Sequence, residues 1–163
     1  LDKENGKIVK YPYLGNFQWG EPQLWLENKK AADFKSMAVD DSIWILTKKN
    51  AGEEDKSSSS PPSLSLRESS VIEKYYNGRL QKTIDLEIFP EPKNFLKIFT
   101  SSQLPELYIL EPEQKRIVIL DKSGQIVKQF QSEKFNNLLD FAVSNDGKTI
   151  YLLNDLKVYK INF

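Results

Sequence analysis

The chain has 163 residues, 39% of them hydrophobic and 12% aromatic, so it can bury the core of one domain and is not a disordered chain. Lysine plus arginine and aspartate plus glutamate both number 23, and this balance leaves no excess positive charge to attract nucleic acid or an anionic membrane. The absence of cysteine and histidine excludes disulfides, thiolate metal sites and the commonest general base.

The first segment, residues 1–32, predicts a strand at residues 7–11 (KIVKY), followed by a long connection rich in aromatic residues. Within this connection the run QLWL can form a further strand. The segment has neither an initiator methionine nor a signal-peptide pattern, and no membrane-spanning segment is predicted anywhere in the chain. We therefore expect a fragment of a longer protein, with any export signal or anchor upstream.

The second segment, residues 33–89, predicts a four-stranded antiparallel blade. The strands FKSMAV and SIWIL are joined by Asp40-Asp41, a residue type that favours turns. The strands VIEKYY and RLQKTI are joined by Asn77-Gly78, a strong hairpin signal. Between the two hairpins, residues 51–70 are rich in serine and proline and predict a flexible insertion.

Residues 90–135 and 136–163 predict two more copies of this unit. The first copy contains the strands FLKIFT, ELYIL, RIVILD and QIVKQF, and Lys122-Ser123-Gly124 forms its last turn. The second copy contains LLDFAV, TIYLL and KVYKI and ends before a fourth strand, so it is an incomplete last blade.

The aromatic centres of the second strands define the repeat. Trp44 and Tyr108 are 64 residues apart, and Tyr108 and Tyr151 are 43 apart. Removing the insertion of about 20 residues brings the first interval to about 43, which is typical of a propeller blade. The sequence therefore predicts an all-β fold, a β-propeller-like array of about three four-stranded antiparallel blades within a larger six- or seven-bladed propeller. In this array all three aromatic centres should be core.

Two registers fit the strand at residues 7–11. By period, Ile8 lies 64 residues before Ile72, which makes the strand a third strand. By motif, LDKENGKIVKY matches LDKSGQIVKQF, which makes it a fourth strand able to close the last blade, and we favour this register.

A closed propeller needs at least four blades. We favour further blades upstream in the parent protein; the alternative is a homodimer in which two copies close one ring.

The run LYILEPEQKRIVILDKSGQIVKQF resembles the blades of NHL-type and related six-bladed β-propellers. Tyr108, Arg116, Ile117 and Gly124 occupy the positions of that pattern, whereas Glu111 stands where the family has aspartate. The resemblance covers this blade well and the other two by pattern. It implies a propeller fold and, since certain NHL propellers bind RNA, an RNA-binding alternative.

One aromatic-rich stretch has no counterpart in the other blades and is the best candidate binding site. Aromatic side chains supply large contact area at low entropic cost. The alternative is that they pack between blades or cap an open end. The candidate residues are Tyr11, Tyr13, Phe17, Trp19 and Trp25.

The acidic residues offer no comparable site. Asp40, Asp41 and Asp146 lie in predicted turns, the run Glu53-Glu54-Asp55 lies in the predicted insertion, and none has the spacing of a calcium loop. No phosphate loop or nucleophile motif occurs, so we assign no catalytic residue, metal or cofactor.

These observations favour a non-enzymatic binding or scaffolding module that presents rim and loop surfaces to a protein, peptide or glycan partner. One alternative is a propeller enzyme, a hydrolase or lyase with a carboxylate-based channel site. The other is NHL-like RNA binding, against which the balanced charge argues.

Overall fold

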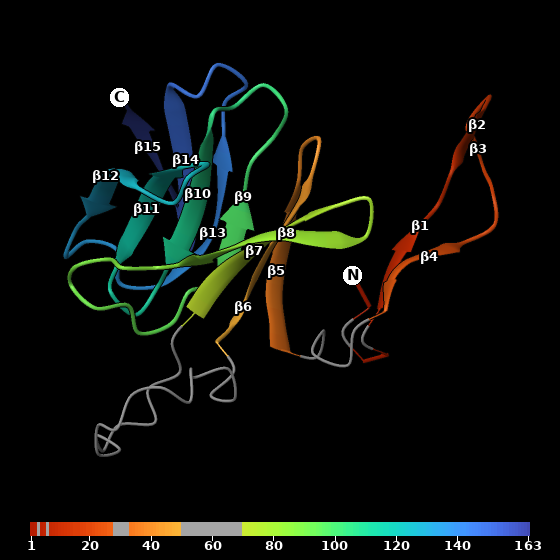
Figure 1. The fold of residues 1–163 in the computed structure, drawn as a ribbon. Helices are drawn as coiled ribbons and strands as arrows, with labels where there is room; N and C mark the ends of the chain where they lie inside the picture. The colour runs from red at the N-terminus through yellow and green to blue at the C-terminus, as the bar shows by residue number, and fades with distance from the viewer. Residues whose placement is uncertain (3, 6, 28–32, 50–69) are drawn as a thin grey trace, which may run out of the picture.

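The computed structural model describes residues 1–2, 4–5, 7–27, 33–49 and 70–163 (Figure 1). The elements named in these ranges are β-strands, β1 to β15. Those from β5 onward form three neighbouring antiparallel sheets, blades A, B and C, and an arm carrying β1 to β4 projects from them (Figure 1). The predicted all-β class is confirmed.

The strands follow one another across each blade in chain order. Blade A contains β5 (Phe34–Val39), β6 (Ile43–Lys48), β7 (Ser70–Tyr76) and β8 (Arg79–Asp85). Blade B contains β9 (Lys97–Phe99), β10 (Glu106–Glu111), β11 (Arg116–Asp121) and β12 (Ile126–Gln131). Blade C contains β13 (Leu138–Val143), β14 (Thr149–Asn154) and β15 (Lys157–Asn162), with β15 at its edge.

The core lies between the blades rather than within one sheet. Along β10, Leu107 and Ile109 join the cluster shared with blade A, while Tyr108 and Leu110 join the cluster shared with blade C. All four side chains are fully buried because both faces of blade B are covered. This explains why β10 is apolar at nearly every position instead of alternating.

The prediction that all three aromatic centres are core holds for two of them. Trp44 is 1% exposed and Tyr108 is 0% exposed, but Tyr151 is 41% exposed, so its prediction was wrong. On β14, Ile150 and Leu152 face blade B. Tyr151 points to the opposite face, which no blade covers in the described part of the chain.

The arm is a long antiparallel hairpin with a second hairpin at its tip. Its strands are β1 (Lys7–Lys10) paired with β4 (Gln23–Glu27), and β2 (Tyr13–Gly15) paired with β3 (Gln18–Trp19). The strand predicted for QLWL is therefore present as β4. The base of the arm packs on blade A, where Ile8 meets the buried side chains of Phe34, Ile45 and Tyr75.

β1 pairs with β4, and within one chain it does not pair with the edge of blade C. Its favoured register, as a fourth strand able to close the last blade, stays a prediction. Residues 51–69 of the predicted insertion lie outside the described residues, and Ser70 begins β7.

An ion pair joins blades A and B at the ends of their strands. Lys122 Nζ lies 2.7 Å from Asp40 Oδ2, and the Asp40 side chain is 6% exposed. Burial raises the pKa of Asp40, but hydrogen bonds from Lys122 and from the Ser42 N–H outweigh it and hold the pKa below its ordinary value. The folded state therefore favours the ionised carboxylate.

Replacing Asp40 with asparagine is expected to lower the free energy of unfolding by about 1–2 kcal/mol at neutral pH. The folded pKa is depressed, so this stabilisation is present above the unfolded value near 3.8 and is lost as the pH falls through the folded pKa. Urea unfolding from pH 7 to pH 3 measures it, with Asp41→Asn on the exposed neighbour as control. A difference between Asp40→Asn and wild type that stays constant across this range would contradict the assignment.

Candidate interaction site on the aromatic hairpin

The hairpin of β2 and β3 at the tip of the arm turns through three consecutive residues with positive φ. These angles are 90° at Gly15, 48° at Asn16 and 59° at Phe17. Glycine and asparagine adopt this conformation readily, but for an aromatic residue it costs roughly 1 kcal/mol. The turn therefore holds Phe17 in a conformation that local preference does not explain.

Four aromatic residues predicted as binding residues lie on this part of the arm and are exposed. Phe17 is 95% exposed, Trp19 65%, Tyr13 57% and Tyr11 56%. Leu14 between them is 66% exposed. Since soluble proteins scatter exposed apolar residues singly, this group on one projecting hairpin is the candidate contact surface.

Contacts within the hairpin fix the positions of these side chains. The rings of Tyr13 and Trp19 have centroids 5.1 Å apart at an interplanar angle of 58°. The Phe17 N–H donates to the Tyr13 hydroxyl at 3.3 Å, and the Gly20 N–H donates to the Pro12 carbonyl at 2.8 Å. These contacts within the hairpin hold Tyr13, Phe17 and Trp19 in place.

Trp25 does not belong to this exposed group. It lies on β4 and packs edge-on against Tyr75 of blade A, with centroids 6.4 Å apart. A Cβ at Gly78 would lie 2.9 Å from the Trp25 carbonyl oxygen, so the hairpin turn of blade A approaches the arm closely at this point. The structure therefore separates the five candidates into four exposed residues and one that packs at the base of the arm.

The tip carries no charge. Residues 11–20, YPYLGNFQWG, contain no lysine, arginine, aspartate or glutamate, although 28% of the whole chain is charged. The tip therefore offers no positive charge that would attract a phosphate backbone.

The described residues bring together no metal-binding cluster. Among them, no group of three or more His, Cys, Asp or Glu side chains is placed to hold a metal ion. A groove of about 450 Å³ runs between β8 and the turn that joins β11 to β12, and in it Lys82 Nζ donates to the Ser123 carbonyl. Over the same part of the chain, we find no helix that could cross a lipid bilayer.

Comparison with known proteins identifies the architecture. No protein-family model and no curated protein matches the sequence. Among solved structures, the chain is similar to one in the nidogen/laminin complex, with a TM-score of 0.61, 12% identity and coverage of 97% of this chain and 55% of that chain. It is also similar to BamB from Moraxella catarrhalis, with a TM-score of 0.50, 12% identity and coverage of 99% and 46% respectively.

Both neighbours are β-propeller proteins, so the three sheets are propeller blades and the chain is a partial β-propeller. The chain spans about half the length of these solved chains. At this identity the similarity shows the fold alone, and the resemblance to the NHL type in particular stays a prediction.

Proposed function

We propose that this chain is a non-enzymatic protein-binding module in which the blades form the scaffold and the β2–β3 hairpin contacts the partner. The observation that carries the proposal is the group formed by Tyr13, Phe17 and Trp19, which is exposed, uncharged and ordered by its own contacts. Large rigid aromatic groups are the residues that most often dominate the energy of protein interfaces. Propellers in general support protein interaction, and one similar structure is that of a nidogen/laminin complex.

The packing of the arm supports a presenting role for the blades. Ile8, Leu26 and Trp25 anchor the base of the arm on blade A, and the tip extends beyond the sheets (Figure 1). A partner that receives the tip therefore meets little obstruction from the blades. The alternatives, a carboxylate-based enzyme and RNA binding, gain no specific contact from the described residues and stay predictions.

Replacing Phe17 and Trp19 with alanine is expected to weaken binding of the partner without unfolding the chain, because both side chains are mostly exposed. The measurement is affinity capture from extracts of cells that express the protein, followed by titration of the captured partner. We expect the affinity to fall by about tenfold or more.

The control is Leu156→Ala, which removes an apolar side chain that is 100% exposed in the turn between β14 and β15. It should leave binding unchanged, and all variants should unfold at the wild-type temperature. Equal binding by wild type and by the Phe17 and Trp19 variant would show that the hairpin is not the contact site.

A further inference from the structure

We infer that two copies of this chain assemble into one ring, in which β1 of each copy adds to the free edge of β15 in the other copy and completes its blade C. This inference does not depend on the function proposed for the hairpin tip. Further blades in a longer chain are the other way to cover this edge, and cross-linking between copies separates the two.

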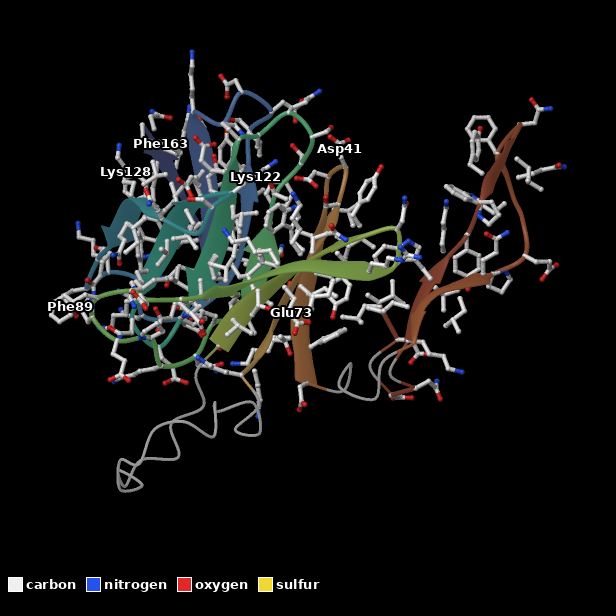
Figure 2. All side chains as sticks on the ribbon, viewed as in Figure 1. Asp41, Glu73, Phe89, Lys122, Lys128 and Phe163 are labelled. Atoms are coloured by element: carbon white, nitrogen blue, oxygen red, sulfur yellow. The ribbon has the colours of Figure 1, made fainter. Side chains whose placement is uncertain are left out.

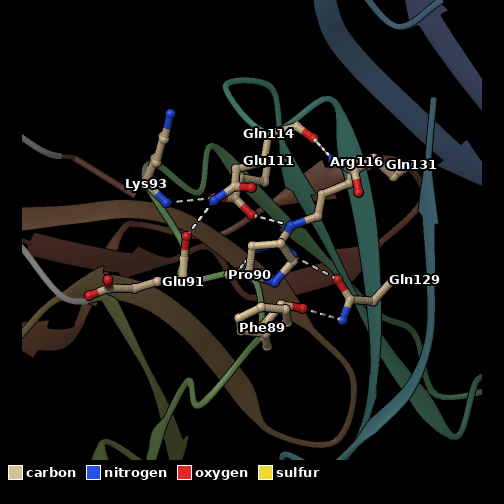
Figure 3. A network of polar contacts seen from close by, with 9 residues as sticks. All are labelled: Phe89, Pro90, Glu91, Lys93, Glu111, Gln114, Arg116, Gln129 and Gln131. Atoms are coloured by element: carbon tan, nitrogen blue, oxygen red, sulfur yellow. Dashed lines mark hydrogen bonds and ion pairs between the residues drawn. The ribbon is translucent and has the colours of Figure 1, made fainter. Parts of the chain in front are cut away.

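In blade B, the fourth strand completes a buried polar network (Figure 3). Arg116 Nε of β11 lies 2.6 Å from Glu111 Oε2 of β10, and both side chains are 0% exposed. Gln129 of β12 accepts a hydrogen bond from Arg116 at 2.8 Å and donates to the Phe89 carbonyl in the loop between β8 and β9. The Lys93 N–H in that loop donates to Glu111. The fourth strand therefore covers and binds the charged residue at the start of the third strand.

Blade C has the same third-strand positions without that cover. Lys157 begins β15 as Arg116 begins β11, but Arg116 is fully buried and Lys157 is exposed. The next residue of β15, Val158, is 66% exposed, whereas its counterpart Ile117 is 0% exposed. In the described part of the chain β15 pairs with β14 alone, so one row of its backbone N–H and C=O groups is free to pair with an added strand.

The C-terminal end of β15 is held by blade B. The ring of Phe163, directly after β15, packs on Phe130 of β12 with centroids 5.3 Å apart. Lys128 Nζ lies 5.3 Å from the centre of the Phe163 ring, and Figure 2 shows these two labelled residues next to each other. The edge of β15 is therefore fixed in advance, which lowers the entropic cost of adding a strand to it.

β1 carries the sequence of a fourth strand. Residues 1–10, LDKENGKIVK, match residues 120–128, LDKSGQIVK, which lead from the third strand of blade B into its fourth. Within one chain β1 lies on the arm beyond blade A, whereas blade C lies at the other end of the row of blades (Figure 1). One edge of β1 pairs with β4, and among the described residues the other edge pairs only at Lys7, with Asp2. The strand that fits blade C is therefore available to another copy of the chain.

Blades A and B share a register between their third and fourth strands. In each blade, the third-strand residue opposite the aromatic centre pairs in turn with a lysine of the fourth strand, Lys82 in blade A and Lys128 in blade B. Lys10 is the residue of β1 that matches Lys128. In blade C, the residue opposite the aromatic centre Tyr151 is Lys160. The shared register therefore places Lys10 of one copy opposite Lys160 of the other.

Two lysines opposite each other are compatible with this pairing, because blade A contains such a pair. Lys74 and Lys82 lie opposite each other on β7 and β8. Lys74 Nζ lies 4.9 Å from the centre of the Trp44 ring, which attracts its charge. Tyr151 pairs with Lys160 as Trp44 pairs with Lys74, so it offers Lys160 an aromatic ring in the same position.

Two copies also supply the right amount of chain for a ring. Each copy contributes three blades, and closed propellers have about four to eight. Because 97% of this chain covers 55% of the solved chain in the nidogen/laminin complex, two copies span about the length of that propeller. Two identical contacts related by a twofold axis close the ring and leave no blade edge unpaired.

Cysteine cross-linking tests the inference, because the chain contains no cysteine of its own. Lys10→Cys and Lys160→Cys are co-expressed as separate variants and exposed to mild oxidation. Residues opposite each other on neighbouring strands have Cβ atoms about 4.5–5.5 Å apart, so a disulfide between positions 10 and 160 needs only a small local shift. We expect a cross-linked product of two chains from the pair and little from either variant alone, since the ring does not bring position 10 next to position 10. Light scattering of the wild type should give the mass of a dimer.

Leu156→Cys is the matched control. Leu156 is 100% exposed in the turn between β14 and β15 and is not opposite Lys10 in the shared register, so this pair should give little product. The reduced variants should unfold at the wild-type temperature, because Lys10 and Lys160 are exposed. The inference is overturned by a chain that stays monomeric at every concentration, or by a dimer in which position 10 does not cross-link to position 160 more readily than to position 156.

Discussion

Gly124→Ala is expected to lower the free energy of unfolding by roughly 2–4 kcal/mol, since two penalties coincide at this turn. Gly124 has a φ of 102°, in which a side chain is strained. A Cβ there would also lie 2.3 Å from Ile84 Cγ2 of the neighbouring blade A, and a contact this short forces the Ile84 side chain or the backbone around it to shift. Chemical denaturation of the two proteins measures the difference.

Gly15→Ala separates the two penalties. Gly15 has a similar φ of 90°, but a Cβ there would meet nothing within 4 Å. This variant should therefore lose only about 1 kcal/mol. If both substitutions cost the same, the close approach between Gly124 and blade A would not be real.

Removing one partner of the buried ion pair is expected to cost still more. Arg116→Met leaves the Glu111 carboxylate buried without its cation, and a penalty of about 3–5 kcal/mol is expected. Replacing both residues, Glu111→Leu with Arg116→Met, removes the unpaired charge and should recover part of the loss. Equilibrium denaturation of the single and double variants gives the coupling energy between the two side chains.

A neighbouring exposed pair provides the control. Lys115 Nζ lies 2.7 Å from Glu133 Oε2, where the glutamate is 89% exposed. Glu133→Gln should leave stability nearly unchanged because an exposed pair gains little in water. If the double variant at Glu111 and Arg116 were as unstable as Arg116→Met alone, the loss would come from packing rather than from an unpaired charge.

The strands of the blades could be predicted from the sequence because their signals are local. Apolar runs of strand length, Asn77-Gly78 and the aromatic spacing mark the hairpins without knowledge of tertiary contacts. Asn77 and Gly78 adopt the expected positive φ, 48° and 74°. The prediction that the aromatic centres face inward holds only where a neighbouring blade covers them. Trp44 is therefore buried, and Tyr151 is not.

Which aromatic side chains are exposed depends on contacts that the sequence pattern does not encode. Trp19 and Trp25 both stand in the same aromatic stretch, and only the pairing of β1 with β4 places Trp25 against Tyr75 and leaves Trp19 in solvent. The hydrogen bonds that hold the loop between β8 and β9 were not predicted because their partners in blade B lie about 20–40 residues away in sequence. Of that network, Arg116 and Glu111 were singled out from the sequence, the latter in place of the aspartate of the resembling blades.

The most direct test of the protein-binding role is photo-cross-linking from the hairpin tip. A p-benzoylphenylalanine introduced at position 17, where the native side chain is 95% exposed, should give a discrete protein adduct in extracts of cells that express the chain. The adduct should disappear when Trp19 is replaced by alanine, and position 156 should not give it. Identical adducts from positions 17 and 156, or an adduct at 17 that survives Trp19→Ala, would contradict the assignment of the hairpin as the interaction site.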